Sequence, residues 1–406
     1  MSAHQNLARG MYAYPWDFID EGIDTVLDAI QGRGGLDTVY VTTWYHSGMF
    51  FLPHNPNRKV HFPEPGALYF EPSGWHGDSK LTPAVSKLHD DWGAFWKELR
   101  AACDARGMQL SAWMPVLHNT GLGSRHPERT VTNAWGDPII HSLCASHTEV
   151  QDVVTNVVRD VANLGVFDRI LLESIEYLPL QHGFHHEVIG LPIDPEVAFA
   201  TSLCFCSACQ ARGEGIGIDV EGLKGWVRDA TQPAFDGKPH QIPSSLEAFR
   251  EIQAGAMGRY LDLRAESLTN VLRLSGETLP NDGPRLAILD FGPLYPLGQF
   301  DGVWQSGVDL AAQGALVDEI HPTFYFDDLG VLENKVRAYK DALHHTDAVV
   351  VPTLRAIAPQ VDGPASLDAQ VAAVSGLGDG MSFYNYSFMR LETLDWIRTS
   401  VQERLS

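Results

Sequence analysis

Two acidic residues lie at the ends of short apolar runs of the kind that form buried strands. Glu173 follows three aliphatic residues within 168–176, and Asp290 lies near the end of the run 285–291. A strand covered on both faces is apolar throughout, so a carboxylate is expected only where such a strand ends. In a (β/α)8 barrel that end carries the active site. The alternative is an acid that caps the next helix or lies in solvent on a loop.

Two carboxylates on neighbouring strands could break a glycosidic bond. One acid protonates the leaving oxygen and the other carboxylate acts as nucleophile or base, at separations of roughly 5–5.5 Å or 6.5–9.5 Å. Neighbouring barrel strands can supply either separation, so we predict Glu173 and Asp290 as the catalytic pair. Glu176 and Glu319 are competing carboxylates, and Glu319 is expected deeper, at the start of its strand.

The ends of the other predicted strands combine aromatic rings with hydrogen-bonding groups. A pyranose presents apolar C–H faces that stack on rings, and hydroxyls that need donors and acceptors. Each Tyr or Trp could equally be a core residue at the barrel edge, and Arg355 could bind a carboxylate or order Glu173. The predicted substrate-binding residues are Tyr14, Trp16, Asp17, Trp44, His46, Trp113, His118, Glu176, His185, His186, His321, Tyr325, Arg355, Tyr384 and Asn385.

The elements that must position these residues follow an alternating pattern. Amphipathic stretches such as 331–345 and 366–375 lie between short runs of apolar, β-branched and aromatic residues, and a final helix is expected at 391–404. The predicted strands are 9–14, 38–45, 109–117, 168–173, 285–291, 317–326, 347–354 and 380–386. Eight βα units favour a single α/β domain over 1–406 with the (β/α)8 TIM-barrel fold, rather than an open sheet.

Two connections are much longer than an ordinary βα loop. Residues 46–90 follow the second strand and are rich in Pro, Gly, His and aromatic residues. We predict that they form a lid over the pocket, with Trp44, His46 or Trp75 stacking on the ligand. Residues 177–284 follow the fourth strand and are long enough for an insertion subdomain, with helices expected at 221–230 and 244–274.

Composition and charge exclude several classes of protein. The 406 residues are 44% hydrophobic, which suffices for a large buried core. A formal charge of −22 disfavours nucleic acids and anionic lipid surfaces as partners. The chain shows no leader and no apolar run of about 20 residues, so we expect a cytoplasmic protein. An organic cofactor is not predicted, and a homo-oligomer is compatible with the sequence.

Three of the five cysteines are closely spaced. Cys204, Cys206 and Cys209 form C-x-C-x2-C, a spacing that suits a structural zinc ion with four tetrahedral ligands. Cys103 or a histidine could supply a fourth ligand. The alternative is that reduced cysteines pack the insertion. An odd number of cysteines does not indicate a secreted disulfide framework.

A histidine-rich segment offers a rival mechanism. His182, His185, His186 and Glu187 could bind a catalytic metal, as in a metal-dependent sugar isomerase or hydrolase. Their spacing lacks the i, i+4 arrangement of the helical HExxH zinc motif. Hydrogen bonding to a substrate, or packing of a loop, explains these histidines equally well.

Several short motifs resemble a known family. NAWGD at 133–137, LCAS at 143–146, LLES at 171–174, HGFHHE at 182–187 and CFCSAC at 204–209 resemble the uncharacterised glycoside-hydrolase-like barrels of bacteria. The cysteine motif is similar to that of the family 42 β-galactosidases. The resemblance runs in order over roughly 8–390, with the recognisable motifs in the central third of the chain.

The resemblance implies a TIM barrel that acts on glycosides, with Glu173 after the fourth strand as a catalytic residue. It favours Glu173 as nucleophile, which leaves Asp290 as acid/base, and it implies Cys144 as the fourth zinc ligand. The β-galactosidases carry their second glutamate after the seventh strand, whereas the seventh strand here ends in Arg355 without an acid. Their catalytic arrangement is therefore not transferred.

The sequence predicts an exo-acting glycosidase for small oligosaccharides or glycosides. Two alternatives stay open. One is the metal-dependent isomerase or hydrolase based on the histidine-rich segment, and the other is a sugar-binding barrel without catalysis.

Overall fold

In the computed structural model, parallel strands at eight positions close into a barrel. The structure describes residues 8–74, 81–182, 186–294, 304–343, 346–378, 380–402 and 404. The strands are β1 (Arg9–Ala13), β2 (Thr38–Thr42), β5 (Gln109–Pro115), β8 (Arg169–Glu173), β9 (Arg285–Asp290), β10 (Glu319–Phe324), β11 (Val349–Val350) with β12 (Thr353–Arg355), and β13 (Met381–Tyr384). The pairing of β13 with β1 closes the circle. The predicted (β/α)8 barrel is confirmed.

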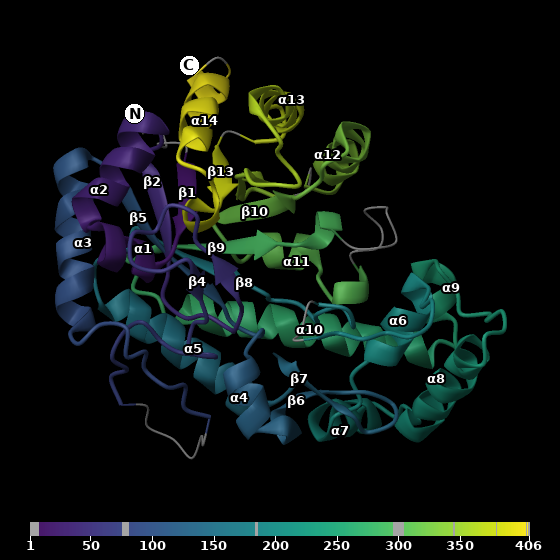
Figure 1. Ribbon diagram of the computed structural model, residues 1–406. Coiled ribbons are helices and arrows are strands. Elements are labelled where there is room, and N and C mark those ends of the chain that lie inside the picture. Colours follow the sequence, from purple (N-terminus) through teal and green to yellow (C-terminus); the bar gives the residue numbers. More distant parts are fainter. Residues whose placement is uncertain are drawn as a thin grey trace.

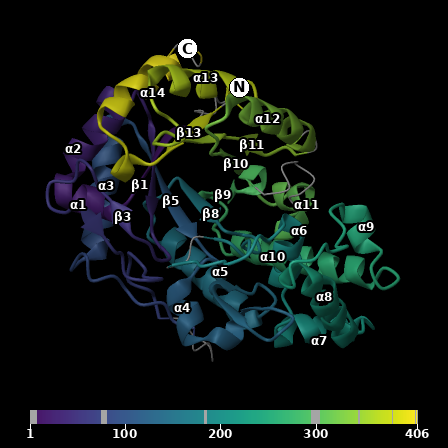
Figure 2. The same ribbon diagram turned by 45° about the vertical axis from the view of Figure 1, so that its right-hand side comes forward.

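Helices surround the barrel, as the view in Figure 2 shows. They are α1 (Pro15–Glu21), α2 (Ile23–Asp28), α3 (Trp92–Arg106), α5 (Thr148–Asn163), α10 (Ala256–Glu277), α11 (Leu310–Gly314), α12 (Leu329–Leu343), α13 (Pro364–Val374) and α14 (Glu392–Gln402). In the described part of the chain, no helix combines the length and the apolar character needed to cross a membrane.

Helix α5 illustrates how the sequence pattern produces this arrangement. Valines recur at the i, i+3 and i+4 spacing that places side chains on one face of a helix. Burying each of them contributes roughly 1.5–3 kcal/mol relative to exposure. The helix ends just before Gly165, whose φ of 67° favours glycine. The fully buried valines are Val150, Val153, Val154, Val157, Val158 and Val161.

Three connections leave the barrel at the carboxyl ends of its strands. The 46–90 segment contains a small hairpin of β3 (Phe50–Phe51) and β4 (Val60–His61). After β5 the chain forms α4 (Thr120–Arg125) and a hairpin of β6 (Thr130–Thr132) and β7 (Pro138–Leu143), which the sequence did not predict.

The third connection forms the helical group at one side of the barrel in Figure 1. It contains α6 (Pro195–Ser202), α7 (Ser207–Gly215), α8 (Val220–Phe235) and α9 (Leu246–Arg250). Helix α10, predicted as part of the insertion, packs beside α5 on the barrel itself. The excursion therefore ends before α10.

A charged cluster fills the interior of the barrel. The carboxylate of Glu319 lies 2.7 Å from Arg169 Nε, 2.9 Å from Arg285 Nη1 and 3.1 Å from His321 Nε2. Arg169 also donates to Ser111 Oγ at 2.8 Å, which links this cluster to β5. Burial alone would raise the pKa of Glu319, but the hydrogen bond with His321 and the Arg169 charge outweigh it and lower the pKa to about 2.

We expect Glu319→Gln to destabilise the protein by about 3–5 kcal/mol at neutral pH, because it leaves the buried Arg169 charge uncompensated. The exposed Glu333→Gln on α12 is the matched control and should change stability by less than about 0.5 kcal/mol. Chemical denaturation measures both.

The same cluster predicts a pH dependence. The folded pKa of Glu319 lies below its ordinary 4.5, so its stabilisation is present above pH 4.5 and is lost as the pH falls toward 2. The difference between wild type and Glu319→Gln should narrow over that interval. A difference that stays constant from pH 7 to pH 3 would contradict the assigned ion pair.

Candidate active site

A cavity of about 660 Å³ opens at the carboxyl ends of the barrel strands. Its walls come from strand ends and from the long connections after β2, β5 and β8. The lining residues are Tyr45, His46, Ser47, Gly48, Met49, Phe50, Trp113, His118, Thr120, His141, Glu173, His182, Leu289, Phe291, Tyr325, Arg355 and Tyr384. The volume is in the range of small-molecule sites, roughly 300–1,000 Å³.

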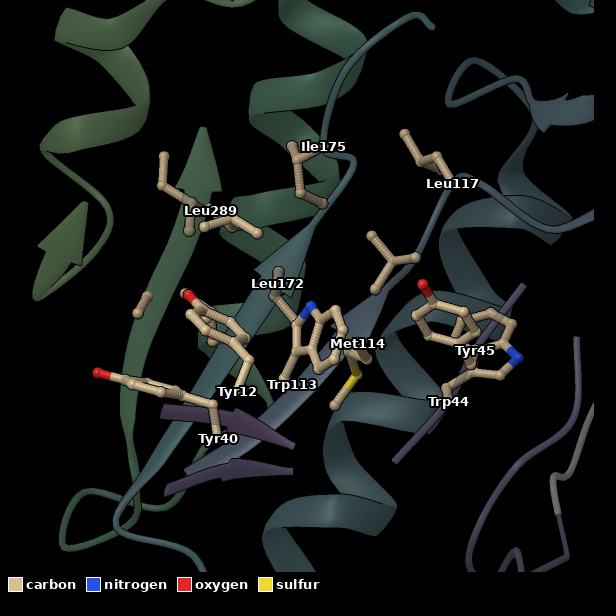
Figure 3. Packing of buried hydrophobic residues seen from close by; sticks show 14 of the residues in the cluster. Tyr12, Tyr40, Trp44, Tyr45, Trp113, Met114, Leu117, Leu172, Ile175 and Leu289 are labelled. Carbon is tan, nitrogen blue, oxygen red and sulfur yellow. The ribbon is translucent and has the colours of Figure 1, made fainter. Parts of the chain in front are cut away.

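Glu173 reaches this cavity because β8 ends there. The carboxylate accepts a hydrogen bond from Nε1 of Trp113 on the neighbouring β5. The Trp113 ring packs edge-on against Tyr12, 5.2 Å between centroids, and Figure 3 shows both among the rings inside the barrel. Burial raises the pKa of Glu173 to about 7, although the Trp113 hydrogen bond opposes this shift. Near neutral pH this carboxyl group is therefore available both as an acid and as a base.

Four histidines form one wall of the cavity, which we call the histidine wall: His46, His118, His141 and His182. The rings of His46 and His118 stack with centroids 3.8 Å apart, and His182 Nε2 lies 3.3 Å from His118 Nδ1. Burial lowers the pKa of His46 to about 3 and that of His182 to about 4, and it lowers the pKa of His118 and His141 as well. The wall is therefore neutral and presents ring nitrogens as donors and acceptors.

Tyrosine hydroxyls cover another part of the cavity. Tyr14 donates to the Tyr45 hydroxyl at 2.8 Å, and its own hydroxyl oxygen lies 3.2 Å from that of Tyr384. The Tyr325 and Tyr384 rings are 5.9 Å apart. Burial raises the pKa of each of these phenols, so they stay neutral hydrogen-bonding groups.

Asp290 does not line the cavity, contrary to the prediction. Leu289 and Phe291 on either side of it do, and Leu289 is in register with Glu173. Since side chains alternate along a strand, Asp290 points to the opposite face from Leu289. Its Oδ1 accepts from the Gly292 amide at 3.0 Å, while its buried Oδ2 has no hydrogen-bond partner among the described residues. Burial raises the pKa of Asp290 to about 7, and the Gly292 hydrogen bond opposes that shift.

Trp16, Asp17 and Asn385 also lie outside the lining, because they support the fold. Ser387 Oγ lies 2.7 and 2.6 Å from the two carboxylate oxygens of Asp17. The same hydroxyl accepts from Trp16 Nε1 at 3.3 Å, and the Ser387 amide donates to Asn385 Oδ1 at 2.9 Å. This buried network ties α1 to the segment after β13.

The remaining predicted residues outside the lining have other positions. Trp44 is buried and donates to the Gly66 carbonyl at 3.0 Å. His321 belongs to the charged cluster inside the barrel, and Glu176 is buried elsewhere. Tyr14 lies behind Tyr45 and Tyr384, and His186 is exposed. His185 and Trp75 lie outside the described residues.

Seven of the predicted residues do line the cavity: Glu173, His46, Trp113, His118, Tyr325, Arg355 and Tyr384. The prediction missed His141, whereas the other lining residues at 46–50 belong to the segment that was predicted to border the pocket. His141 lies on β7, and the only signal for that hairpin was the Asn133 to Gly136 turn, where Gly136 has a φ of 93°. The lid segment contributes 46–50 to the lining.

The four cysteines named by the sequence come together away from the strand ends. Cys144 Sγ lies 3.7 Å from Cys204, 3.5 Å from Cys206 and 3.5 Å from Cys209, and all four are buried. Sulfurs about 2.3 Å from a tetrahedral centre are about 3.8 Å apart, so the cluster fits a metal ion of that geometry. Cys144, immediately after β7, completes the set, whereas Cys103 is on α3.

The rival metal site at the histidine-rich segment has less support. Within the described ranges, the four cysteines are the group of potential ligands close enough to share a metal ion. His182 turns into the cavity toward His118, while His186 is exposed with a φ of 51°. The described histidines of that segment therefore do not converge on one point.

Solved structures with this fold cover nearly the whole chain at low identity. The PgaB (BpsB) glycoside hydrolase domain from Bordetella bronchiseptica has a TM-score of 0.58 and 13% identity, covering 98% of this chain and 99% of that one. A β-galactosidase from Marinomonas ef1 has a TM-score of 0.57 and 13% identity, covering 98% and 59%. The catalytic domain of β-amylase from Paenibacillus polymyxa has 0.55 and 10%, covering 98% of each chain.

These structural neighbours are TIM-barrel glycoside hydrolases, and at such identities the likeness shows the barrel fold. No protein-family model and no curated protein sequence matches the chain.

We expect Trp113→Phe to raise the pKa of Glu173 above about 7, because the lost N–H donor stabilised the carboxylate form. Carbon-13 NMR of glutamate-labelled protein, with the resonance assigned from Glu173→Gln, gives the titration midpoint. Trp44→Phe is the control, because its indole bonds to Gly66 outside the cavity. An unchanged midpoint in Trp113→Phe would remove Trp113 as the group that sets this pKa.

Proposed function

We propose that this protein is a glycoside hydrolase and that Glu173 is its catalytic acid/base. The observation that carries the proposal is a buried carboxyl group with a pKa of about 7 at the carboxyl end of a barrel strand, in a cavity lined by several other polar side chains. The fold shared with three glycoside hydrolases supports the same reaction class.

The chemistry follows from the state of Glu173. Because burial raises its pKa to about 7, the Glu173 carboxyl can hold a proton near neutral pH and donate it to the leaving glycosidic oxygen. As the proton is transferred, the bond between the anomeric carbon and the leaving oxygen breaks, and Trp113 stabilises the carboxylate that remains on Glu173. A water oxygen then bonds to the anomeric carbon and gives its proton to that carboxylate, which restores the acid. This reverses the predicted order of roles, in which Glu173 was the favoured nucleophile.

The second carboxylate of the mechanism stays a prediction. Among the described lining residues Glu173 is the only acid, and Asp290 lies one residue out of the lining on β9. The two-carboxylate mechanism therefore depends on whether Asp290 contributes to turnover. The kcat of the Asp290→Asn variant tests this directly.

The substrates we propose are small glycosides or oligosaccharides cleaved from one end. The cavity is walled by neutral imidazole and phenol groups that suit sugar hydroxyls, with the Trp113 and Phe50 rings for stacking. Residues 46–50 from the lid segment close one side, which favours a pocket for a terminal sugar over a long cleft.

We further propose that the four-cysteine cluster holds a structural zinc ion. Four thiolates at tetrahedral spacing are the donor set zinc prefers. Zinc there would fix the chain after β7 to α7 without contacting the cavity lining. The five free cysteines support a reducing compartment such as the cytoplasm.

We expect Glu173→Gln to lower kcat on a cleaved aryl glycoside by about 10²–10⁴-fold, because it removes the proton donor. A panel of 4-nitrophenyl α- and β-glycosides identifies the substrate. Asp290→Asn should lower kcat less than tenfold, because its side chain faces away from the cavity. Equal losses in the two variants would restore Asp290 as the catalytic partner, and an unchanged Glu173→Gln would refute the proposed role.

We expect purified protein to contain about one zinc ion per chain by elemental analysis. Cys206→Ser should lose zinc and lower the melting temperature more than it changes the affinity for substrate. Cys103→Ala, a buried cysteine on α3, is the matched control and should retain the metal. A metal-free preparation with full stability would contradict the structural zinc site.

A further inference from the structure

Arg355 is the last residue of β12 and lines the cavity beside Tyr325 and Tyr384. It is in register with Tyr384 on β13. Arginines inside a protein are normally paired, because a buried charge without a counterion is costly. Arg169 in the same barrel follows this rule, since Glu319 compensates its charge.

Arg355 has no such partner in the described part of the chain. No carboxylate there forms an ion pair with it, and its Nε is buried without a hydrogen bond. The half-buried guanidinium therefore keeps unused donors that face a cavity large enough for a ligand.

Glu173 is not the counterion of Arg355. No ion pair joins the two side chains in the described part of the chain, where the Glu173 carboxylate instead accepts a hydrogen bond from Trp113 Nε1. The sequence left open whether Arg355 binds a carboxylate or orders Glu173, and this observation favours the first role.

Apart from Glu173, the other lining residues supply no negative charge to Arg355. The histidine wall is neutral, and the tyrosines keep their protons because burial raises each pKa. Arg355 is the only permanent cation among the described lining residues, in a protein whose net charge is −22. A neutral sugar would leave that charge unpaired after displacing water from it.

We propose that the cavity binds an acidic sugar, a hexuronic acid unit whose carboxylate pairs with Arg355. The planar guanidinium matches a carboxylate with two parallel hydrogen bonds. Tyr325 and Tyr384 line the same cavity and offer hydroxyl groups to the sugar. This inference rests on the proposed glycoside hydrolase function and names its substrate class, a glycoside of a uronic acid.

Calorimetric binding tests the inference without requiring turnover. The probes are D-glucuronate and D-galacturonate, each compared with the neutral sugar of the same configuration. We expect the wild-type protein to bind at least one uronate about 10- to 100-fold more tightly than its neutral counterpart, the range a charge-assisted hydrogen bond supplies. Equal affinity for both members of each pair would overturn the proposal.

Variants assign this preference to Arg355. Arg355→Gln should abolish the ratio between uronate and neutral sugar, and Arg355→Lys should retain part of it, because the point charge remains without the fork. Arg337→Gln, an exposed change on α12, is the control for net charge and should keep the full ratio. Melting temperatures show that each variant is folded. A ratio preserved in Arg355→Gln would remove the residue from recognition.

Glucose 6-sulfate and glucose 6-phosphate separate a carboxylate site from a general anion site. Tighter binding of either ester than of glucuronate would overturn the carboxylate assignment. Hydrolysis of 4-nitrophenyl α- and β-glucuronides or galacturonides then tests the reaction. Uronate binding without any hydrolysis would refute the proposed function and leave the binding inference standing. Preferred hydrolysis of neutral glycosides would support the proposed function and refute the inference that the substrate is a uronic acid glycoside.

Discussion

The buried negative charge of Glu319 is the constraint on which the barrel interior depends. Closing eight strands places this carboxylate where water cannot solvate it, so neighbouring strands must supply its partners. Arg169 on β8 and Arg285 on β9 provide the charge, and His321 on β10 provides a hydrogen bond. Because Arg169 also donates a hydrogen bond to Ser111 on β5, the contacts link four adjacent strands, β5, β8, β9 and β10, and fix their register.

Two electrostatic layers therefore succeed each other along the barrel axis. In the lower layer two arginines compensate the charge of Glu319, and the His321 hydrogen bond and the Arg169 charge lower its pKa against the effect of burial. In the upper layer burial dominates, so it raises the pKa of Glu173 to about 7 against the Trp113 hydrogen bond and keeps the histidine wall neutral near pH 7. The same fold thus produces opposite shifts for two glutamates, according to whether cations lie within reach. Function is expected in the layer whose groups lack internal partners.

The alternation of apolar runs and amphipathic stretches predicted the fold well, since strand period and helix period are local properties. It also predicted Glu173, because an acid at a strand end needs only the strand to be located. It did not show that Asp290 lies outside the cavity lining, because a shift of one residue reverses the face of a strand, and it did not locate His141, whose hairpin has a short and weakly patterned sequence. Trp16, Asp17 and Asn385 were predicted to bind substrate but take part in a buried hydrogen-bond network. The sequence could not separate the two roles, because both use the same types of aromatic and polar residue.

The cavity has two halves of different origin. Tyr325, Arg355 and Tyr384 stand on or next to barrel strands, whereas His46, His118, His141 and His182 come from three separate excursions. Insertions and substitutions are tolerated far better in the connections between strands than in the strands of a closed barrel. Homologous chains can therefore diverge in the histidine half while the strand-borne half is retained, so that one side of the cavity can change its ligand contacts without altering the barrel strands.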